Sequence, residues 1–162
     1  MSRLDSFIRR LEAQRACLNQ AATLIDGIAG NVLEFGLGNG RTYDHLRERL
    51  DGRDIYVFER KVAAHPDCIP PDDRLFLGDF LDTLPKAIAQ LGRATALANL
   101  DIGSGDEEAS RRLARAMLPF VLQLLAPRGI LISDQPVDDP ALDALPLPPS
   151  IKPGRYFLHR RR

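Results

Sequence analysis

The chain has 162 residues, of which 44% are hydrophobic and 27% are charged, a composition typical of one globular domain and not of a disordered or collagen-like chain. Lys and Arg together number 22, as do Asp and Glu, so the net charge is zero and no overall field favours nucleic acid or a membrane surface. The cysteines Cys17 and Cys68 do not form a CxxC pair, and the sequence has neither a signal-peptide core nor an apolar run of membrane-spanning length. We therefore expect a cytoplasmic protein.

Predicted helices and strands alternate along the chain. Apolar residues recur at helical spacing over residues 3–28, and we expect this helix either to cross a sheet or to contact a partner or cover a site. Short strands are predicted at 31–35, 54–59, 75–78, 94–100 and 130–133, with helices from 41 onward, over 81–91 and over 105–125. Prolines restrict any helix between 60 and 73 to a short one, and Ser104 with Glu107 has the spacing of a capping box for the last helix. Five alternations predict an α/β fold with a doubly wound, mostly parallel sheet.

The segment after residue 135 is rich in proline. Six of the twelve prolines lie between Pro136 and Pro153, so this stretch is neither a regular helix nor a central strand. A last strand is predicted over 155–159. We therefore expect a single domain made of an N-terminal helix (1–30), a core (31–135) and a proline-rich loop with a last strand (136–162).

Glycines stand at alternate positions between the first predicted strand and the next helix. They are Gly36, Gly38 and Gly40, and Glu34 precedes them by two residues. Glycine lets the backbone approach a ligand where a Cβ would clash, and the following helix offers free N–H groups. Ligands of parallel sheets bind beyond the carboxyl ends of the strands, where this turn is expected. The GxGxG spacing differs from the GxGxxG of dinucleotide sites, and a turn without any ligand is the alternative.

Two further strand ends carry residues suited to a nucleoside. Glu59 ends the second strand, where a carboxylate can accept hydrogen bonds from both hydroxyls of a ribose. Pairing with the two basic residues that follow it is the alternative. After the third strand, Asp79 can accept from an adenine amino group while Phe80 covers the ring. Asp79 could equally cap the next helix.

The order and spacing of these three motifs resemble those of class I S-adenosylmethionine-dependent methyltransferases over roughly residues 30 to 135, and the chain looks like the short bacterial methyltransferase-like proteins. The resemblance implies a Rossmann-like methyltransferase fold, with S-adenosylmethionine as cofactor and S-adenosylhomocysteine as product. It also implies that the glycine turn holds the methionine part, Glu59 the ribose, and Asp79 with Phe80 the adenine. The cofactor-binding residues expected on this basis are Glu34, Gly36, Leu37, Gly38, Asn39, Glu59, Arg60, Gly78, Asp79, Phe80, Asn99 and Asp101.

The fourth strand ends at Asp101, which the resemblance places beside the reactive sulfonium and the methyl acceptor. Asp101 could stabilise these surroundings, orient the acceptor or act as base, and it is the candidate catalytic residue. A metal interpretation also exists, because catechol-type O-methyltransferases hold a divalent cation with an Asp after the fourth strand and an Asp-Asn pair after the fifth. Asp101 with Asp134-Gln135 resembles that layout and would suit Mg²⁺. However, Gln135 replaces the Asn, and Ser104 stands where that family has a Lys base, so we assign no metal ligand.

The resemblance implies methyl transfer to an acceptor that the sequence does not identify. The zero net charge argues against general nucleic-acid binding, so we expect a small molecule. One alternative is a module that binds S-adenosylmethionine or S-adenosylhomocysteine without catalysis, which the short C-terminal part and the lack of an obvious base favour. A nicotinamide-dependent oxidoreductase is a further alternative, against which the missing GxxG spacing argues.

A departure from the class lies after the fifth strand. A typical class I domain continues there with another helix and two strands, whereas only 27 residues follow Gln135. We therefore expect a sheet that is shortened after the fifth strand, with an exposed edge. Together with the apolar half-helix at 117–125, this edge predicts a homo-oligomer. The N-terminal helix, the proline-rich loop or another subunit would then supply walls for the substrate.

Overall fold

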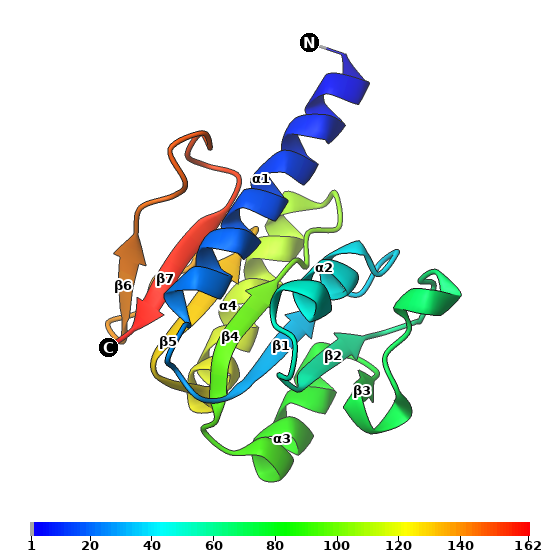
Figure 1. Ribbon diagram of the computed structural model, residues 1–162, viewed down its shortest axis with the longest axis vertical. Helices are drawn as coiled ribbons and strands as arrows, with labels where there is room; N and C mark the ends of the chain where they lie inside the picture. Colours follow the sequence, from blue (N-terminus) through cyan, green and yellow to red (C-terminus); the bar gives the residue numbers. More distant parts are fainter. Residues whose placement is uncertain (1) are drawn as a thin grey trace.

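The computed structural model describes residues 2–162, which form a seven-stranded sheet flanked by helices (Figure 1). The helices are α1 (Arg3–Leu24), α2 (Arg41–Arg49), α3 (Phe80–Leu91) and α4 (Glu107–Leu124), with short 3₁₀ turns η1 (Pro66–Cys68) and η2 (Asp72–Arg74). The strands are β1 (Asn31–Phe35), β2 (Ile55–Glu59), β3 (Leu75–Leu77), β4 (Thr95–Leu100), β5 (Leu125–Ser133), β6 (Leu142–Leu145) and β7 (Phe157–Arg161). Their order across the sheet is β3-β2-β1-β4-β5-β7-β6.

Strands β1 and β4 form the centre of the sheet, and the chain changes winding direction between them. All six residues of β4 are buried, as expected for a parallel strand that helices cover on both faces. β1 pairs in parallel with β2 on one side and with β4 on the other, so the connections leaving β1 and β4 diverge. A crevice opens at such a switch point, beyond the carboxyl ends of the strands. The predicted α/β fold is thus confirmed.

The last two strands complete the sheet. β7 pairs antiparallel with β5, and β6 pairs antiparallel with β7 at the outer edge. The region after β5 is shortened as expected, because residues 134–141 join β5 to β6 as a loop. The β5 edge is not exposed, because β7 pairs with it, close to the last strand predicted over 155–159. The outer strand β6 was not foreseen within the proline-rich segment. Pro140 and Pro146 flank β6 and do not interrupt it, so an edge strand fits between them.

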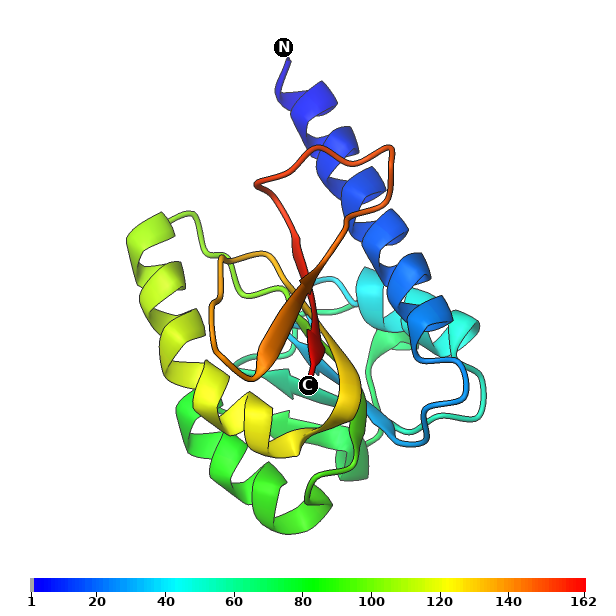
Figure 2. The same ribbon diagram turned by 90° about the vertical axis from the view of Figure 1, so that its left-hand side faces the viewer.

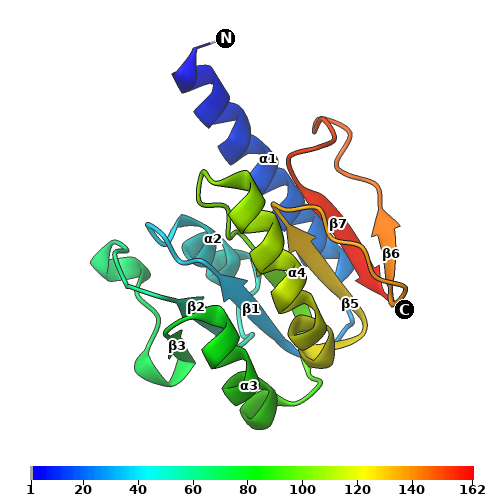
Figure 3. The same cartoon turned by 180° about the vertical axis from the view of Figure 1, so that it is seen from behind.

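Two apolar layers lie on opposite faces of the sheet. α1 and α2 cover one face, and α3 and α4 cover the other, as Figures 1 and 3 show from opposite sides. Buried α1 residues such as Leu18 and Ala21 pack with Val32 and Leu97 of the sheet. The helix predicted over 3–28 therefore does cross the sheet. Its first turns project beyond the sheet, beside the loop between β6 and β7 (Figure 2).

Helix α4 differs from its prediction at its start. It begins at Glu107, and the Asp106 side chain caps it by accepting from the Ala109 N–H at 2.9 Å. The expected capping box with Ser104 is therefore wrong. Its apolar second half is explained by burial in the chain's own core, at Met117, Leu118, Val121 and Leu124. In residues 2–162, no helix is both long enough and apolar enough to cross a membrane.

Candidate functional site

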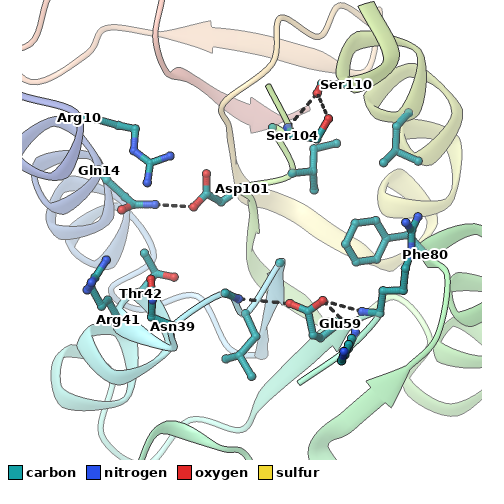
Figure 4. A pocket seen from close by; sticks show the side chains of 18 of the residues that line it. Arg10, Gln14, Asn39, Arg41, Thr42, Glu59, Phe80, Asp101, Ser104 and Ser110 are labelled. Atoms are coloured by element: carbon teal, nitrogen blue, oxygen red, sulfur yellow. Dashed lines mark hydrogen bonds between the residues drawn. The ribbon is translucent and has the colours of Figure 1, made fainter. Parts of the chain in front are cut away.

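A cavity of about 690 Å³ lies at the carboxyl ends of β1, β2, β3 and β4, where the change of winding places a crevice. Its walls come from α1, from the turns after these strands and from the start of α4 (Figure 4). The residues that line it are Arg10, Leu11, Gln14, Gly36, Leu37, Gly38, Asn39, Arg41, Thr42, Glu59, Arg60, Lys61, Gly78, Phe80, Asp101, Ile102, Gly103, Ser104, Ala109, Ser110 and Leu113. Nine of the twelve predicted cofactor residues are among them. Glu34, Asp79 and Asn99 are not.

The turn after β1 needs glycine for two separate reasons. At Gly36, a Cβ would lie 2.3 Å from the carbonyl oxygen of Asp101, so a side chain there would push β1 and β4 apart. At Gly38, φ is +52° and nothing lies within 4 Å of an added Cβ, so this position faces open space. A backbone that leaves such a space can approach a ligand closely.

The Glu59 carboxylate at the end of β2 joins two turns. Its Oε2 accepts from the Gly38 N–H at 3.2 Å, and its Oε1 accepts from the backbone N–H groups of Arg60 at 2.7 Å and Lys61 at 3.2 Å. Backbone amides, and not basic side chains, therefore hold this carboxylate. The arrangement fixes Glu59 against the glycine turn and inside the cavity, with acceptor capacity remaining on Oε2.

The turn between β3 and α3 brings Gly78 and Phe80 to the cavity. The Phe80 ring meets the Phe35 ring edge to face, with 5.8 Å between their centroids. Asp79 takes the N-cap position of α3, as its alternative interpretation predicted, but its side chain makes no capping hydrogen bond. Its Oδ1 instead pairs with Arg60 Nε at 2.7 Å, and both side chains are well exposed.

Glu34 and Asn99 lie beneath the cavity. The Glu34 carboxylate accepts from the Thr42 hydroxyl and from Asn99 Nδ2, the latter at 2.8 Å, and neither Glu34 nor Asn99 is exposed. Burial raises the pKa of Glu34 to about 8, against the lowering effect of its two hydrogen bonds. Glu34 was expected to contact the cofactor. The structure instead places it behind Thr42, which lines the cavity, whereas Glu34 does not.

Asp101 follows β4 and faces the cavity beside α1. Its Oδ2 accepts from Gln14 Nε2 at 2.6 Å, as Figure 4 shows. Burial raises the pKa of Asp101 to about 6, and the nearby Asp134 charge contributes to this rise, while the Arg10 charge opposes it. Asp101 is thus a partly buried carboxylate that can exchange a proton near neutral pH.

Asp134 stabilises the loop that follows Asp101. Its carboxylate accepts from the backbone N–H groups of Gly103 at 2.7 Å and Ile102 at 3.3 Å, so its two oxygens are directed to this loop. A Cβ at Gly103 would lie 2.6 Å from Asp134 Oδ2, which explains the glycine. Residues 2–162 contain no group of three or more His, Cys, Asp or Glu side chains placed to hold a metal ion. The Mg²⁺ interpretation therefore gains no support from this geometry.

Sequence reasoning missed the part of the cavity wall that α1 forms. The sequence analysis expected this helix to supply a wall for the substrate but named none of the residues that would do so. The structure shows that they are Arg10, Leu11 and Gln14. The sequence held one signal, because Gln14 interrupts the apolar stripe between Leu11 and Leu18, and the structure shows that Gln14 is buried. A buried amide needs a partner, and here that partner is Asp101.

Comparison with known proteins identifies the family. A family model described as S-adenosyl-L-methionine methyltransferase matches residues 1–161. The chain belongs to this family. It is also similar to the crystal structure of an S-adenosyl-L-methionine methyl transferase from Silicibacter pomeroyi DSS-3, with 46% identity and a TM-score of 0.94 over 100% of this chain and 99% of that one. Comparison with curated proteins gave no match.

More distant structures share the fold. Human methyltransferase-like protein 13, solved in complex with SAH, is 18% identical with a TM-score of 0.58 over 98% of this chain and 80% of that one. A putative O-methyltransferase from Klebsiella pneumoniae is 18% identical with a TM-score of 0.57 over 88% and 80% of the two chains. The resemblance stated from the motifs and the Rossmann-like fold are thereby confirmed, and S-adenosylmethionine is the cofactor of this methyltransferase family.

Proposed function

We propose that this methyltransferase transfers the methyl group of S-adenosylmethionine to a small-molecule acceptor in the cavity above β1 and β4, with Asp101 at the reaction centre. One observation carries the proposal. The glycine turn, Glu59, Phe80 and Asp101, which come from four different strand ends, line the same cavity. Its volume of about 690 Å³ lies within the range of small-molecule sites.

The residues present suit each part of the cofactor. Gly38 leaves room for the methionine part beside the N-terminus of α2, where free backbone N–H groups favour a carboxylate. Glu59 has acceptor capacity for the ribose hydroxyls, and Phe80 offers a ring face for the adenine. When bound, S-adenosylmethionine supplies a methyl group already activated by its sulfonium.

The chain's own residues then have two tasks. The cavity walls must hold the acceptor in line with the donor, since positioning accounts for much of the rate of such a transfer. Asp101, with a pKa of about 6, is largely ionised at neutral pH and can accept a proton from an O–H or N–H nucleophile. Gln14 donates a hydrogen bond to one oxygen of this carboxylate and so orients it in the cavity.

Calorimetric titration with S-adenosylhomocysteine tests the site, with NADH as the control ligand. We expect micromolar binding of S-adenosylhomocysteine by the wild type, no binding of NADH, and a loss of at least about tenfold in the Glu59→Ala variant, because a ribose contact and a turn support are both removed. Glu48→Ala is the matched control, since Glu48 is an exposed residue of α2 outside the cavity. No binding by folded, ligand-free wild-type protein would overturn the proposed function.

Self-association also stays a prediction. The β5 edge and the apolar half of α4, on which it rested, are both covered within the chain. The large apolar side chains that remain exposed on the projecting end of α1 are Leu4, Phe7 and Ile8, with exposed fractions of 66%, 42% and 44%. We propose this end of α1 as the contact of a homo-oligomer.

A further inference from the structure

The cavity carries an excess of positive charge. Its charged lining residues are Arg10, Arg41, Arg60 and Lys61 against Glu59 and Asp101. Both carboxylates already accept hydrogen bonds from the protein. Arg60 pairs with Asp79 at the rim, which offsets one cation. Positive charge therefore remains where a ligand would bind.

Arg10 is placed to use this charge. It lies on α1, one turn before Gln14, and its guanidinium extends toward Asp101 in Figure 4. Throughout residues 2–162, Arg10 has no hydrogen-bond or ion-pair partner, and its guanidinium carbon lies 5.5 Å from the centroid of the Phe7 ring. Its N–H donors are therefore free. The planar guanidinium presents them in pairs whose geometry matches the two oxygens of a carboxylate.

The bound cofactor would increase the excess charge. This step rests on the proposed function. S-adenosylmethionine combines a sulfonium and an ammonium group with a single carboxylate, so it brings a net positive charge into the cavity. A neutral acceptor would leave that charge uncompensated beside Arg10, whereas an anionic acceptor would compensate it.

The other walls of the cavity also limit the shape of the acceptor. Leu11 of α1 and Leu113 of α4 both line the cavity, and so does Ser104, which follows the end of β4. A pocket that combines two leucines with an excess of cations suits a small molecule with an apolar body and an acidic group.

We propose that Arg10 anchors the methyl acceptor and that this acceptor is a small carboxylic acid. Its carboxylate pairs with the Arg10 fork, and its nucleophilic atom then faces Asp101. The same chemistry could be supplied by the carboxylate of the cofactor's methionine part. The two sources differ in a testable way, because only the first requires a second molecule in the cavity.

The test uses benzoate and benzamide, which share a shape and differ in charge. Each is titrated into the protein saturated with S-adenosylhomocysteine, and binding is followed by calorimetry and by the NMR signals of the Arg Nε–H groups. We expect benzoate to bind at least about tenfold more tightly than benzamide and to shift the Arg10 signal, as for a charge-assisted bidentate pair. Arg10→Gln should abolish this preference. Arg9→Gln should keep it, because Arg9 is an exposed neighbour on α1 that does not line this cavity.

Two further titrations separate the possible failures. S-adenosylhomocysteine and 5′-methylthioadenosine, which lacks the carboxylate, are titrated into wild type and Arg10→Gln. We expect the substitution to leave both affinities within about twofold, as for a residue outside the cofactor contacts. If Arg10→Gln weakens only S-adenosylhomocysteine, Arg10 serves the cofactor and the proposal is overturned. Equal binding of benzoate and benzamide, or no binding of benzoate to the cofactor-product complex, also overturns it. Failure of the wild type to bind S-adenosylhomocysteine would instead overturn the proposed function.

Discussion

Gln14 of α1 donates a hydrogen bond to Asp101 at the end of β4, with 2.6 Å between Nε2 and Oδ2 and a separation of 87 positions in the chain. Gln14 is buried, so its amide needs this partner. The contact ties the N-terminal helix to the residue proposed as base. α1 is therefore a wall of the site as well as a cover of the sheet.

The first prediction concerns this contact. Replacing Gln14 with Leu removes a hydrogen bond to the charged form of Asp101, so the pKa of Asp101 should rise above its value of about 6. Loss of a bond to a charged group should also lower the free energy of unfolding by about 1–3 kcal/mol. Carboxyl ¹³C NMR across a pH titration of the unliganded protein measures the first effect, and urea unfolding measures the second. Gln90→Leu, at an exposed position of α3, should change neither, and an unaltered Asp101 titration in Gln14→Leu would contradict the prediction.

The second prediction uses the buried Glu34. Its pKa is about 8 in the folded protein and near 4.5 in the unfolded chain, so the folded state binds the proton more tightly between these values. Stability should therefore fall as the pH rises from about 5 to 8, by a few kcal/mol at most, since one pKa unit corresponds to about 1.4 kcal/mol. Glu34→Gln has no proton to lose, so it should lack this part of the pH dependence.

The measurement is urea unfolding of wild type and Glu34→Gln from pH 5 to 9. The difference between the two curves isolates Glu34, because Asp101 and Asp134 are present in both. In the Glu34→Gln variant, a single amide carbonyl must accept from both Thr42 and Asn99, so the variant starts from a lower stability at pH 5. The prediction is that the free energy of unfolding falls more steeply with rising pH in the wild type than in Glu34→Gln. Parallel curves for the two proteins would rule it out.

Much of this fold could be predicted from sequence because local signals coincide with it. β1 matches its predicted bounds, and α2 begins at Arg41 as expected, because the glycine turn separates them. β6 could not be predicted, since its four residues lie among prolines and gain their pairing only from β7. The start of α4 also differs, because the sequence spacing placed the cap at Ser104 and Asp106 occupies the cap position.

Some residues of the site could likewise be predicted from the sequence, and others could not. Residues at strand ends, such as Glu59 and Phe80, were predictable because the topology brings those ends together. Arg10 was not, because the packing angle of α1 on the sheet decides which of its arginines reaches the cavity. Glu34 is the opposite case. Its position in the motif predicted that it would line the cavity, but it is buried behind Thr42 and accepts a hydrogen bond from that residue instead.

The third prediction separates two glycines of the turn. Gly36→Ala should destabilise the protein strongly, because its Cβ would overlap the Asp101 carbonyl. Gly38→Ala meets no atom, so its cost should be the left-handed backbone alone, about 1–2 kcal/mol, while its methyl group occupies ligand space and weakens S-adenosylhomocysteine binding. Gly52→Ala, with φ +82° and open surroundings outside the cavity, should show the same cost with normal binding. Equal affinities for the Gly38 and Gly52 variants would mean that the turn does not approach the ligand.

The fourth prediction addresses Asp79, which pairs with Arg60 and does not line the cavity. This exposed pair should contribute less than about 1 kcal/mol, so Asp79→Asn should melt like the wild type. If Asp79 turns to the adenine amino group when the cofactor binds, the wild type should prefer S-adenosylhomocysteine over its inosine analogue, and Asp79→Asn should lose part of that preference. Calorimetry with both ligands measures this, and Asp82→Asn, an exposed acid in the first turn of α3, is the control. An unchanged preference would exclude Asp79 from adenine recognition.

The fifth prediction concerns self-association through the projecting end of α1. Phe7, with Leu4 and Ile8, exposes apolar area on the turns that project beyond the sheet, and burying it against a second copy would be favourable at roughly 25 cal/mol per Å². Light scattering at micromolar concentration should therefore give a multiple of the 18.0 kDa chain mass. The double variant Leu4→Ser, Phe7→Ser should reduce it to a single chain, whereas Leu81→Ser, which removes an exposed leucine on α3, should not. A monomeric wild type would show that the surface of α1 is free in solution and that the walls of the cavity come from one chain alone.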